Sequence, residues 1–251
     1  MQQKQQTYTH FGYETVTQAE KTAKVGEVFD SVANRYDLMN DLMSFGLHRI
    51  WKSLTTHLSF IKTGNIVLDC AAGTADISKK LAQLVGDTGQ VIVSDINQTM
   101  LGLGRAKLID AGLVENIEYV TANAESLPFR ENYFDAITIG FGLRNVTDIT
   151  NALACMQTIL KPGGALIILE FSKPSLPGLA AIYDLYSFKV LPNLGKMIVG
   201  DRDSYQYLAE SIRKHPDQMN LKSLLCAAGF DKVDYYNFSG GIVALHKAYK
   251  F

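Results

Sequence analysis

Two kinds of apolar pattern alternate along the middle of the chain. Short apolar runs, of the kind that form buried strands, occupy residues 65–70, 90–95, 117–122, 133–140 and 164–171. Between them, apolar residues recur every three or four positions, as in amphipathic helices, over residues 76–86, 97–111 and 148–160. Strands that alternate with helices of this length are typical of βαβ units, so the pattern predicts an α/β fold with a parallel sheet.

The C-terminal end of the chain changes this pattern. A helix is predicted at residues 217–228, and two further strands at 232–238 and 241–249. The two strands are joined by a short Ser-Gly-Gly link, which suits an antiparallel hairpin. The sheet should therefore have seven strands, most of them parallel.

Two helical segments lie outside the alternation of strands and helices. Residues 18–60 precede the first predicted strand, and residues 175–215 follow the fifth. Neither a repeat nor a linker separates them from the rest. We therefore expect a single domain over residues 1–251, with an N-terminal helical cap at 1–60 and a helical insertion at 175–215.

Composition and charge exclude several classes of protein. The chain has 251 residues, with 24 Lys and Arg against 25 Asp and Glu, so no global positive field favours nucleic acid. Its three cysteines, Cys70, Cys155 and Cys226, are far apart, which argues against a disulfide framework and a zinc site. No apolar run approaches the roughly 20 residues of a membrane helix. We expect a cytoplasmic protein that at most lies on the inner face of a membrane.

Polar residues follow the ends of four predicted strands. Asp69 ends the first strand and is followed by the loop AAGTAD, and Asp95 ends the second, 95 − 73 = 22 residues after Gly73. The third strand leads into NAE at 123–125, and the fourth into GFGLRN at 140–145. Ligands of open parallel sheets bind beyond these strand ends, where an acidic residue at this spacing binds ribose hydroxyls. The alternative for Asp95 is that it only caps the next helix.

The loop after the first strand argues against a dinucleotide. Gly73 is its only glycine, so the GxGxxG spacing that cradles a pyrophosphate is absent. Asp69 and Asp76 would repel a pyrophosphate and would suit a ligand with positive charge. S-adenosylmethionine carries such charge on its sulfonium and its ammonium group. A nicotinamide-dependent oxidoreductase is the alternative that the loop disfavours.

Long stretches of the chain resemble one family closely. They include THFGYETV (9–16), VFDSVANRYDLMNDLMSFGLHRIWK (28–52), SDINQTML (94–101), NAESLPF (123–129), FGLRNVTD (141–148), LKPGGALIILEFSKP (160–174), SYQYLAESIRKHPDQ (204–218) and GGIVALHK (240–247). They are similar to the ubiquinone/menaquinone biosynthesis C-methyltransferases, within the class I methyltransferases that use S-adenosylmethionine. The resemblance implies a Rossmann-like, seven-stranded, mostly parallel sheet with one antiparallel strand.

The resemblance also implies a set of cofactor contacts. The contacts that match the family are Thr74, Asp95, Asn123 and Ala124, and a fifth family position falls on Gly140. Asp69 and Gly73, at the first strand end and in its loop, are candidates from their place in the sequence. This chain has Ala72 and Ala75 where the family usually has glycine, and Gly140 where the family usually has serine. If position 75 needs a positive φ, its alanine costs on the order of 1 kcal/mol. These departures motivate one rival hypothesis, a binding or assembly subunit that has lost turnover.

The implied reaction is C-methylation of a polyprenylated quinol ring. The substrates implied are demethylmenaquinol, 2-methoxy-6-polyprenyl-1,4-benzoquinol or both. A phenol has a pKa near 10, so ionising the ring hydroxyl at pH 7 costs about 4 kcal/mol. Arg144 is our candidate for the cation that stabilises the quinolate, and Asn145 for a hydrogen-bond partner. An ion pair with Asp148 is the structural alternative for Arg144, and His10 and His48 are the next candidates for proton transfer.

Partners follow from the same substrate. No metal is required, and no spacing of His, Cys, Asp or Glu indicates one. A polyprenyl tail needs an apolar channel, and residues 179–190 carry more apolar side chains than one helical stripe can use. We expect the surplus apolar side chains to line this channel, to make a peripheral membrane contact, or to form the contact of a homodimer or a biosynthetic complex.

Overall fold

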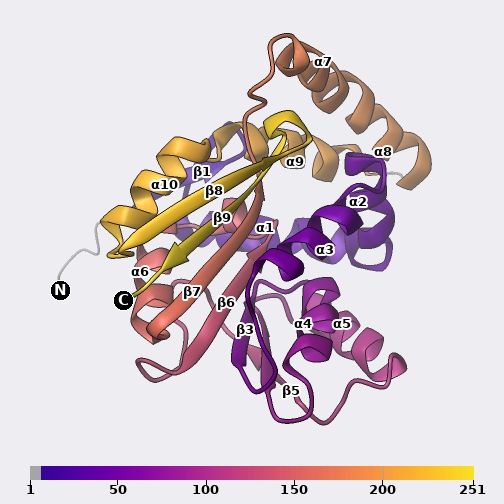
Figure 1. Ribbon diagram of the computed structural model, residues 1–251. Coiled ribbons are helices and arrows are strands. Elements are labelled where there is room, and N and C mark those ends of the chain that lie inside the picture. Colours follow the sequence, from indigo (N-terminus) through magenta and orange to yellow (C-terminus); the bar gives the residue numbers. More distant parts are fainter. Residues whose placement is uncertain (1–6, 200) are drawn as a thin grey trace, which may run out of the picture.

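The computed structural model describes residues 7–199 and 201–251, and a seven-stranded sheet forms its centre (Figure 1). The strands follow the order β5-β4-β3-β6-β7-β9-β8. Their bounds are β3 Ile66–Cys70, β4 Gln90–Asp95, β5 Ile117–Thr121, β6 Phe134–Gly140, β7 Leu160–Phe171, β8 Lys232–Phe238 and β9 Val243–Tyr249. Only β9 runs antiparallel to its neighbours β7 and β8. The predicted fold class is confirmed.

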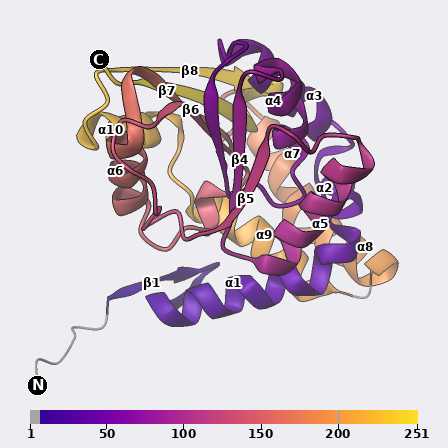
Figure 2. The same cartoon turned by 90° about the horizontal axis from the view of Figure 1, so that it is seen from below.

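Helices cover both faces of the sheet (Figure 2). One face carries α3 (His48–Leu58), α4 (Asp76–Val85) and α5 (Gln98–Asp110), and the other carries α6 (Ile149–Ile159) and α10 (Gln218–Ala227). Successive residues of a strand point to opposite faces, so Val67 packs into one core and Leu68 into the other. Strands buried on both faces are apolar throughout, which is why the sequence pattern found them.

The N-terminal segment contains a hairpin that the sequence pattern did not predict. It consists of β1 (Tyr8–Phe11) and β2 (Glu14–Thr17), which pair antiparallel. Each strand has only four residues and is largely exposed, so it lacks an apolar signature. The helical region expected at 18–60 follows as α1 (Gln18–Val32), η1 (Ala33–Arg35), α2 (Tyr36–Ser44) and α3. Residues 1–6 of the expected helical cap lie outside the described residues.

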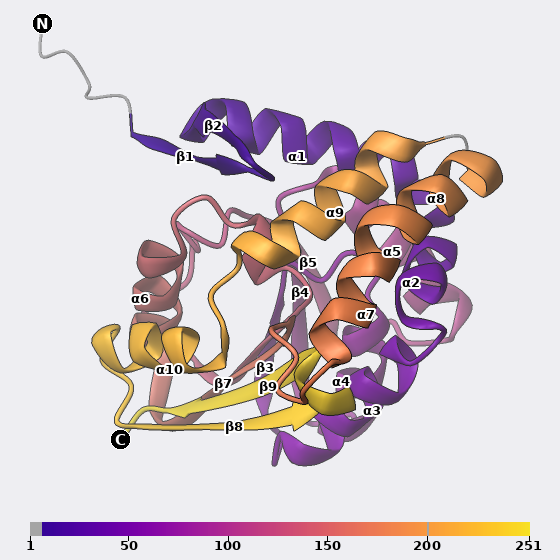
Figure 3. The same cartoon turned by 90° about the horizontal axis from the view of Figure 1, so that it is seen from above.

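The insertion after β7 is helical, as predicted. It consists of α7 (Leu179–Leu185), η3 (Tyr186–Val190), α8 (Leu191–Val199) and α9 (Arg202–Lys214). Figure 3 shows α9 lying between the other helices of the insertion, α7 and α8, and the N-terminal hairpin β1–β2 with α1. Residues 179–190 bury Tyr183, whereas Ile182 is 68% exposed, so part of the apolar surface of this segment stays outside the core.

One strand boundary differs from the prediction. The strand predicted at 164–171 is longer in the structure, because β7 already begins at Leu160, which pairs with Phe134 of β6, and so includes the segment KPGG. The register of β6 on β7 shifts between Phe134 and Ala136. A bulge of this kind accommodates turn-forming residues inside a longer strand.

Candidate functional site

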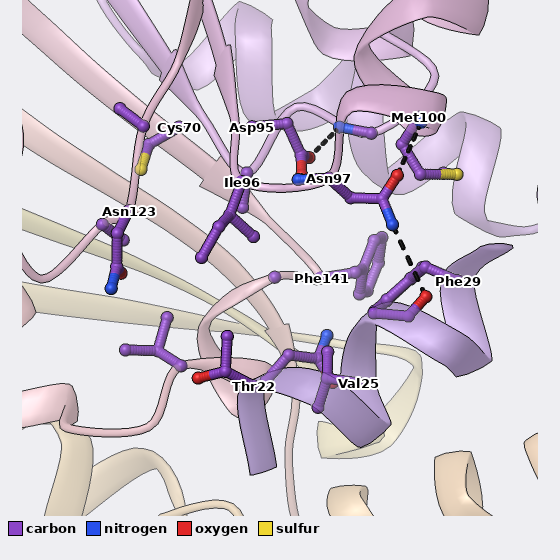
Figure 4. A pocket seen from close by; sticks show the side chains of 18 of the residues that line it. Thr22, Val25, Phe29, Cys70, Asp95, Ile96, Asn97, Met100, Asn123 and Phe141 are labelled. Carbon is purple, nitrogen blue, oxygen red and sulfur yellow. Dashed lines mark hydrogen bonds between the residues drawn. The ribbon is translucent and has the colours of Figure 1, made fainter. Parts of the chain in front are cut away.

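A pocket of about 1030 Å³, open solvent at its mouth included, lies at the carboxyl ends of β3, β4 and β6. Helix α1 closes its far side: Figure 4 shows Thr22 and Val25 across the pocket from Asp95 and Ile96. Six of the residues expected from sequence line it, namely Gly73, Asp95, Asn123, Ala124, Gly140 and Asn145. Asp69, Thr74 and Arg144 are not among its lining residues.

The loop between β3 and α4 has an unusual backbone. Its φ angle is +51° at Ala71, +56° at Gly73 and +61° at Ala75, although only one of the three is glycine. A left-handed conformation costs an L-residue roughly 1–2 kcal/mol, so the strain expected at Ala75 is present. Ala72 has no positive φ, so the two alanines that replace family glycines are not equivalent.

Helix α5 approaches this loop closely. A Cβ at Gly104 would lie 2.9 Å from the carbonyl oxygen of Gly73 and 3.0 Å from the Cβ of Ala75. Glycine at 104 therefore lets the helix pack directly on the loop backbone, a role that the third glycine has in dinucleotide loops.

We expect Ala75→Gly to keep or strengthen binding of S-adenosylmethionine. The change relieves the left-handed strain, which offsets the loss of a buried methyl group worth about 0.8 kcal/mol. Ala72→Gly is the matched control, because glycine there adds chain entropy to the unfolded state without relieving positive φ, and should lower stability by about 0.5–1 kcal/mol. Calorimetric titration and urea unfolding check both variants. Weaker binding in Ala75→Gly than in Ala72→Gly would contradict the strain argument.

Asp95 ends β4 with its side chain at the pocket. Its Oδ2 accepts a hydrogen bond from the N–H of Gly73 and its Oδ1 one from the N–H of Asn97, both at 2.8 Å. The helix that follows is capped by Asn97, whose Oδ1 accepts from the N–H of Met100, so Asp95 is not its N-cap. Burial raises the pKa of Asp95 above its ordinary value, against hydrogen bonds from the backbone that lower it.

The third strand end forms the side wall of the pocket. Asn123 accepts a hydrogen bond at Oδ1 from the N–H of Glu125 at 3.0 Å, which fixes this turn. Glu125 in turn accepts from the N–H groups of Thr147 and Asp148 at 2.9 and 3.1 Å. Among the lining residues only Asp95 and Glu125 carry charge, so the pocket is acidic. An acidic, mostly apolar pocket suits a cationic ligand.

Asp69 and Thr74 lie behind the loop, in a smaller cavity that Gly140 also lines. The carboxylate of Asp69 accepts hydrogen bonds from the hydroxyls of Ser78 and Thr138. Burial raises its pKa to about 6 in spite of these bonds. Thr74 reaches Asp37 with a long contact of 3.4 Å. Of the seven predicted cofactor residues, these two are therefore the ones that do not line the larger pocket.

Asp76 does not contribute free negative charge to the loop, contrary to the sequence argument. Its two oxygens bind Nζ of Lys52 at 2.7 Å and Nζ of Lys107 at 2.5 Å. The two ammonium groups outweigh burial and lower the pKa of Asp76 to about 2. Its charge is therefore compensated, and the acidity of the pocket rests on Asp95 and Glu125.

Gly140 leaves room for a side chain from α4. A Cβ at position 140 would collide with Cδ1 of Ile77. The serine usual in the family would thus need Ile77 to move, and here the backbone of Gly140 lines the pocket instead.

Arg144 and Asn145 lie together in η2 (Leu143–Asn145), but they face different surroundings. The Arg144 guanidinium is 3% exposed and pairs with Glu170 of β7, with 2.9 Å between Nη1 and Oε1. It also donates to the carbonyl of Phe141. Asp148, the partner that we considered, caps α6 instead. Asn145 lines the pocket and accepts a hydrogen bond from the hydroxyl of Tyr207 at 2.9 Å.

Several site residues escaped the sequence reasoning. Glu170 left a usable signal, a single charge inside the apolar strand ALIILEF. Tyr207 and the α1 residues left none, because only long-range packing brings them to the pocket. His10 is exposed on the hairpin, and His48 lines a different cleft beside Lys52 and Asp76. Neither histidine lines the pocket.

The sequence matches known proteins along its whole length. Residues 16–250 match the profile of the ubiE/COQ5 methyltransferase family. Over 251 residues, and 100% of both chains, it is 56% identical to the ubiquinone/menaquinone biosynthesis C-methyltransferase UbiE of Escherichia coli (strain K12 / DH10B). It is equally similar to the protein of that name from Shigella boydii serotype 18, again over 100% of both chains.

Solved structures of lower identity share the fold. A SAM-dependent methyltransferase from Aquifex aeolicus superposes with a TM-score of 0.62 at 17% identity, covering 84% of this chain and 95% of that one. The [4+2]-cyclase SpnF superposes with a TM-score of 0.67 at 17% identity, covering 90% and 94%. Their names differ in reaction, so the fold alone does not identify the chemistry.

Proposed function

Since the chain belongs to the ubiE/COQ5 methyltransferase family, we propose that it transfers a methyl group from S-adenosylmethionine to a ring carbon of a polyprenylated quinol. The substrates proposed are demethylmenaquinol, 2-methoxy-6-polyprenyl-1,4-benzoquinol or both, as steps of menaquinone and ubiquinone biosynthesis. The observation that carries the proposal is the full-length identity of 56% to C-methyltransferases of that name.

The pocket fits S-adenosylmethionine by charge and by hydrogen bonding. Asp95 would hold the ribose hydroxyls, Asn123 and Ala124 would flank the adenine, and the Gly73 and Gly140 backbones would border the methionyl part. When bound there, the cofactor supplies an electrophilic methyl group on its sulfonium. The acidic lining formed by Asp95 and Glu125 supports a cationic ligand more than a pyrophosphate, which disfavours the oxidoreductase alternative.

The acceptor has to be activated on the other side of the methyl group. Its ring carbon becomes nucleophilic when the neighbouring hydroxyl ionises, and the site must lower the cost of that ionisation. Asn145 lines the pocket and offers a polar group to the ring oxygen. Arg144 lies directly beside it, behind the pocket wall, and would act through its positive charge rather than by contact.

A peripheral membrane contact and a cytoplasmic location at the inner face of the membrane are part of the proposal. Within residues 7–199 and 201–251, no helix has both the length and the hydropathy to cross a bilayer. The turn between α2 and α3 and the helices α3, α7 and α8 expose large apolar side chains: Phe45, Leu47, Ile50, Ile182, Leu185 and Met197. Exposed cations accompany them at Arg49, Lys189 and Lys196. Apolar residues with basic neighbours favour an anionic lipid surface. A homodimer or biosynthetic complex stays a prediction.

The proposed function can be tested with purified protein and chemically reduced acceptors. We expect methylated product, detected by mass spectrometry, from both quinols or one of them, and none from the oxidised quinone, which has no hydroxyl to ionise. Titration calorimetry should show saturable heat with S-adenosylmethionine, and thermal shift should show no stabilisation by NADH. Saturable cofactor binding without product would favour another methyl acceptor. Absence of both heat and product would favour the assembly-subunit hypothesis.

A further inference from the structure

One hydrogen bond connects the pocket to a helix of the insertion. Tyr207 of α9 is 4% exposed, and its hydroxyl donates to Oδ1 of Asn145 over 2.9 Å. The ring of Tyr207 is held by stacking on Phe11 of β1, with centroids 4.2 Å apart and planes 13° apart. Two elements remote in sequence thus fix one side chain of the pocket wall.

This bond determines which end of the Asn145 amide can serve a ligand. An asparagine side chain offers one oxygen acceptor and one NH₂ donor group. Burial raises the pKa of the Tyr207 hydroxyl, so that hydroxyl stays protonated and acts as the donor. The oxygen of Asn145 is therefore engaged, and its NH₂ group is the part left for the pocket. The backbone N–H of Asn145 is bound to the carbonyl of Gly142 at 3.1 Å, which fixes the base of the side chain.

We propose that Tyr207 is a positioning residue for methyl transfer: by holding Oδ1 of Asn145, it directs the NH₂ group of Asn145 at the oxygen of the acceptor ring. This inference rests on the proposed function. A donor already oriented toward an oxygen that gains negative charge stabilises that charge without reorganisation. With the amide reversed, the carbonyl oxygen would face the same negative charge and repel it.

The N-terminal hairpin and α1 support this arrangement. Besides the Phe11 stack, Thr9 donates from Oγ1 to the carbonyl of Thr147 at 3.3 Å. Lys21 of α1 donates from Nζ to the carbonyl of Val146 at 2.8 Å. The backbone that follows Asn145 is thus tied to the same N-terminal segment that stacks on Tyr207.

The direct test is Tyr207→Phe, which keeps the stacked ring and removes only the hydroxyl. We expect kcat to fall roughly tenfold, the size of one lost hydrogen bond, with the dissociation constant of S-adenosylmethionine unchanged. Tyr205→Phe is the matched control. Tyr205 lies on the same helix and is fully buried, and its hydroxyl has no hydrogen-bond partner in the described part of the chain. Its loss should leave kcat unchanged.

A second comparison separates positioning from a merely structural role. In an Asn145→Ala background, Tyr207→Phe should cause no further loss, because the two residues act through one bond. The pH profile of kcat should keep its shape in Tyr207→Phe. A full tenfold loss in the Asn145→Ala background would overturn the proposal. So would the loss of one limb of the pH profile, which would make Tyr207 itself the proton acceptor.

Nuclear magnetic resonance of the Asn145 side-chain amide reports the orientation of that amide independently of catalytic activity. Its signals, assigned by their absence in Asn145→Ala, should shift or broaden in Tyr207→Phe and stay unchanged in Tyr205→Phe. If the wild-type protein methylates no quinol, the proposed function fails, and this measurement still decides whether Tyr207 orients Asn145. An unchanged amide signal in Tyr207→Phe overturns the inference.

Discussion

Replacing Asp95 with alanine should weaken binding of S-adenosylmethionine by about 1.5–3 kcal/mol, or roughly 10- to 150-fold in the dissociation constant. The carboxylate lies at the pocket and binds the N–H groups of Gly73 and Asn97. Its removal takes away the proposed acceptor for the ribose hydroxyls and also frees the loop amide at Gly73. Asp95→Asn keeps one acceptor oxygen, so its affinity for S-adenosylmethionine should lie between those of the wild type and Asp95→Ala. Titration calorimetry measures all three proteins.

Loss of stability has to be separated from loss of affinity in this test. Asp217→Ala is a suitable control, because Asp217 caps α10 away from the pocket by accepting from the N–H of Asn220. Removing such a cap lowers stability by about 1 kcal/mol and should leave cofactor binding unchanged. An unchanged dissociation constant in Asp95→Ala would reject the ribose assignment.

The pH dependence of S-adenosylmethionine binding is an independent test of whether Asp95 binds the ribose. Because burial raises the pKa of Asp95, its carboxylate takes up a proton at a higher pH than an ordinary aspartate does. Cofactor affinity should therefore decrease as the pH falls through this raised pKa, and remain intact above it. Asp95→Asn has no such proton to take up, so its affinity should not follow that trend.

The residues that sequence reasoning placed correctly are those whose position follows from local pattern. β3 and β4 are buried on both faces, so their apolar runs mark them directly. Asp95 is the last residue of such a run, at a fixed spacing from the loop, and the ends of β3 and β4 reach the same edge of the sheet. The strain at Ala75 could be expected because alanine replaces glycine in a tight loop.

The rest of the site depends on packing between distant segments. Arg144 meets Glu170 only because β6 and β7 are neighbours, and Tyr207 meets Asn145 only because α9 folds back over η2. The positive φ of Ala71 has no counterpart in the sequence pattern, since alanine is rare in that conformation. Long-range contacts of this kind have no periodicity that a single sequence could reveal.

The buried ion pair of Arg144 with Glu170 determines which substitutions can test the role of Arg144. If its positive charge stabilises the quinolate, Arg144→Gln should lower turnover roughly 100- to 1000-fold, as for other preorganised electrostatic stabilisers. Arg144→Lys keeps the charge but loses the planar guanidinium, so its turnover should lie between those of the wild type and Arg144→Gln. Cofactor affinity should stay near that of the wild type, because Arg144 does not line the pocket.

The same substitution would also leave Glu170 buried and unpaired, at 2% exposure. A buried charge without its ion-pair partner costs on the order of 3–5 kcal/mol of stability. Low turnover of Arg144→Gln alone could therefore result from its instability. The double variant Arg144→Gln with Glu170→Gln removes both charges and avoids this cost. The single variant Glu170→Gln keeps the cation and removes only its partner.

These variants separate a catalytic charge from a structural ion pair. If the charge acts on the acceptor, Arg144→Gln and the double variant are both slow at pH 7, whereas Glu170→Gln retains most of its turnover. Raising the pH should partly restore Arg144→Gln, because the acceptor hydroxyl then ionises without help from a nearby cation. If instead the double variant recovers nearly wild-type turnover, the pair only holds η2 in place. In that case the NH₂ group of Asn145, oriented by Tyr207, would be the main stabiliser of the quinolate.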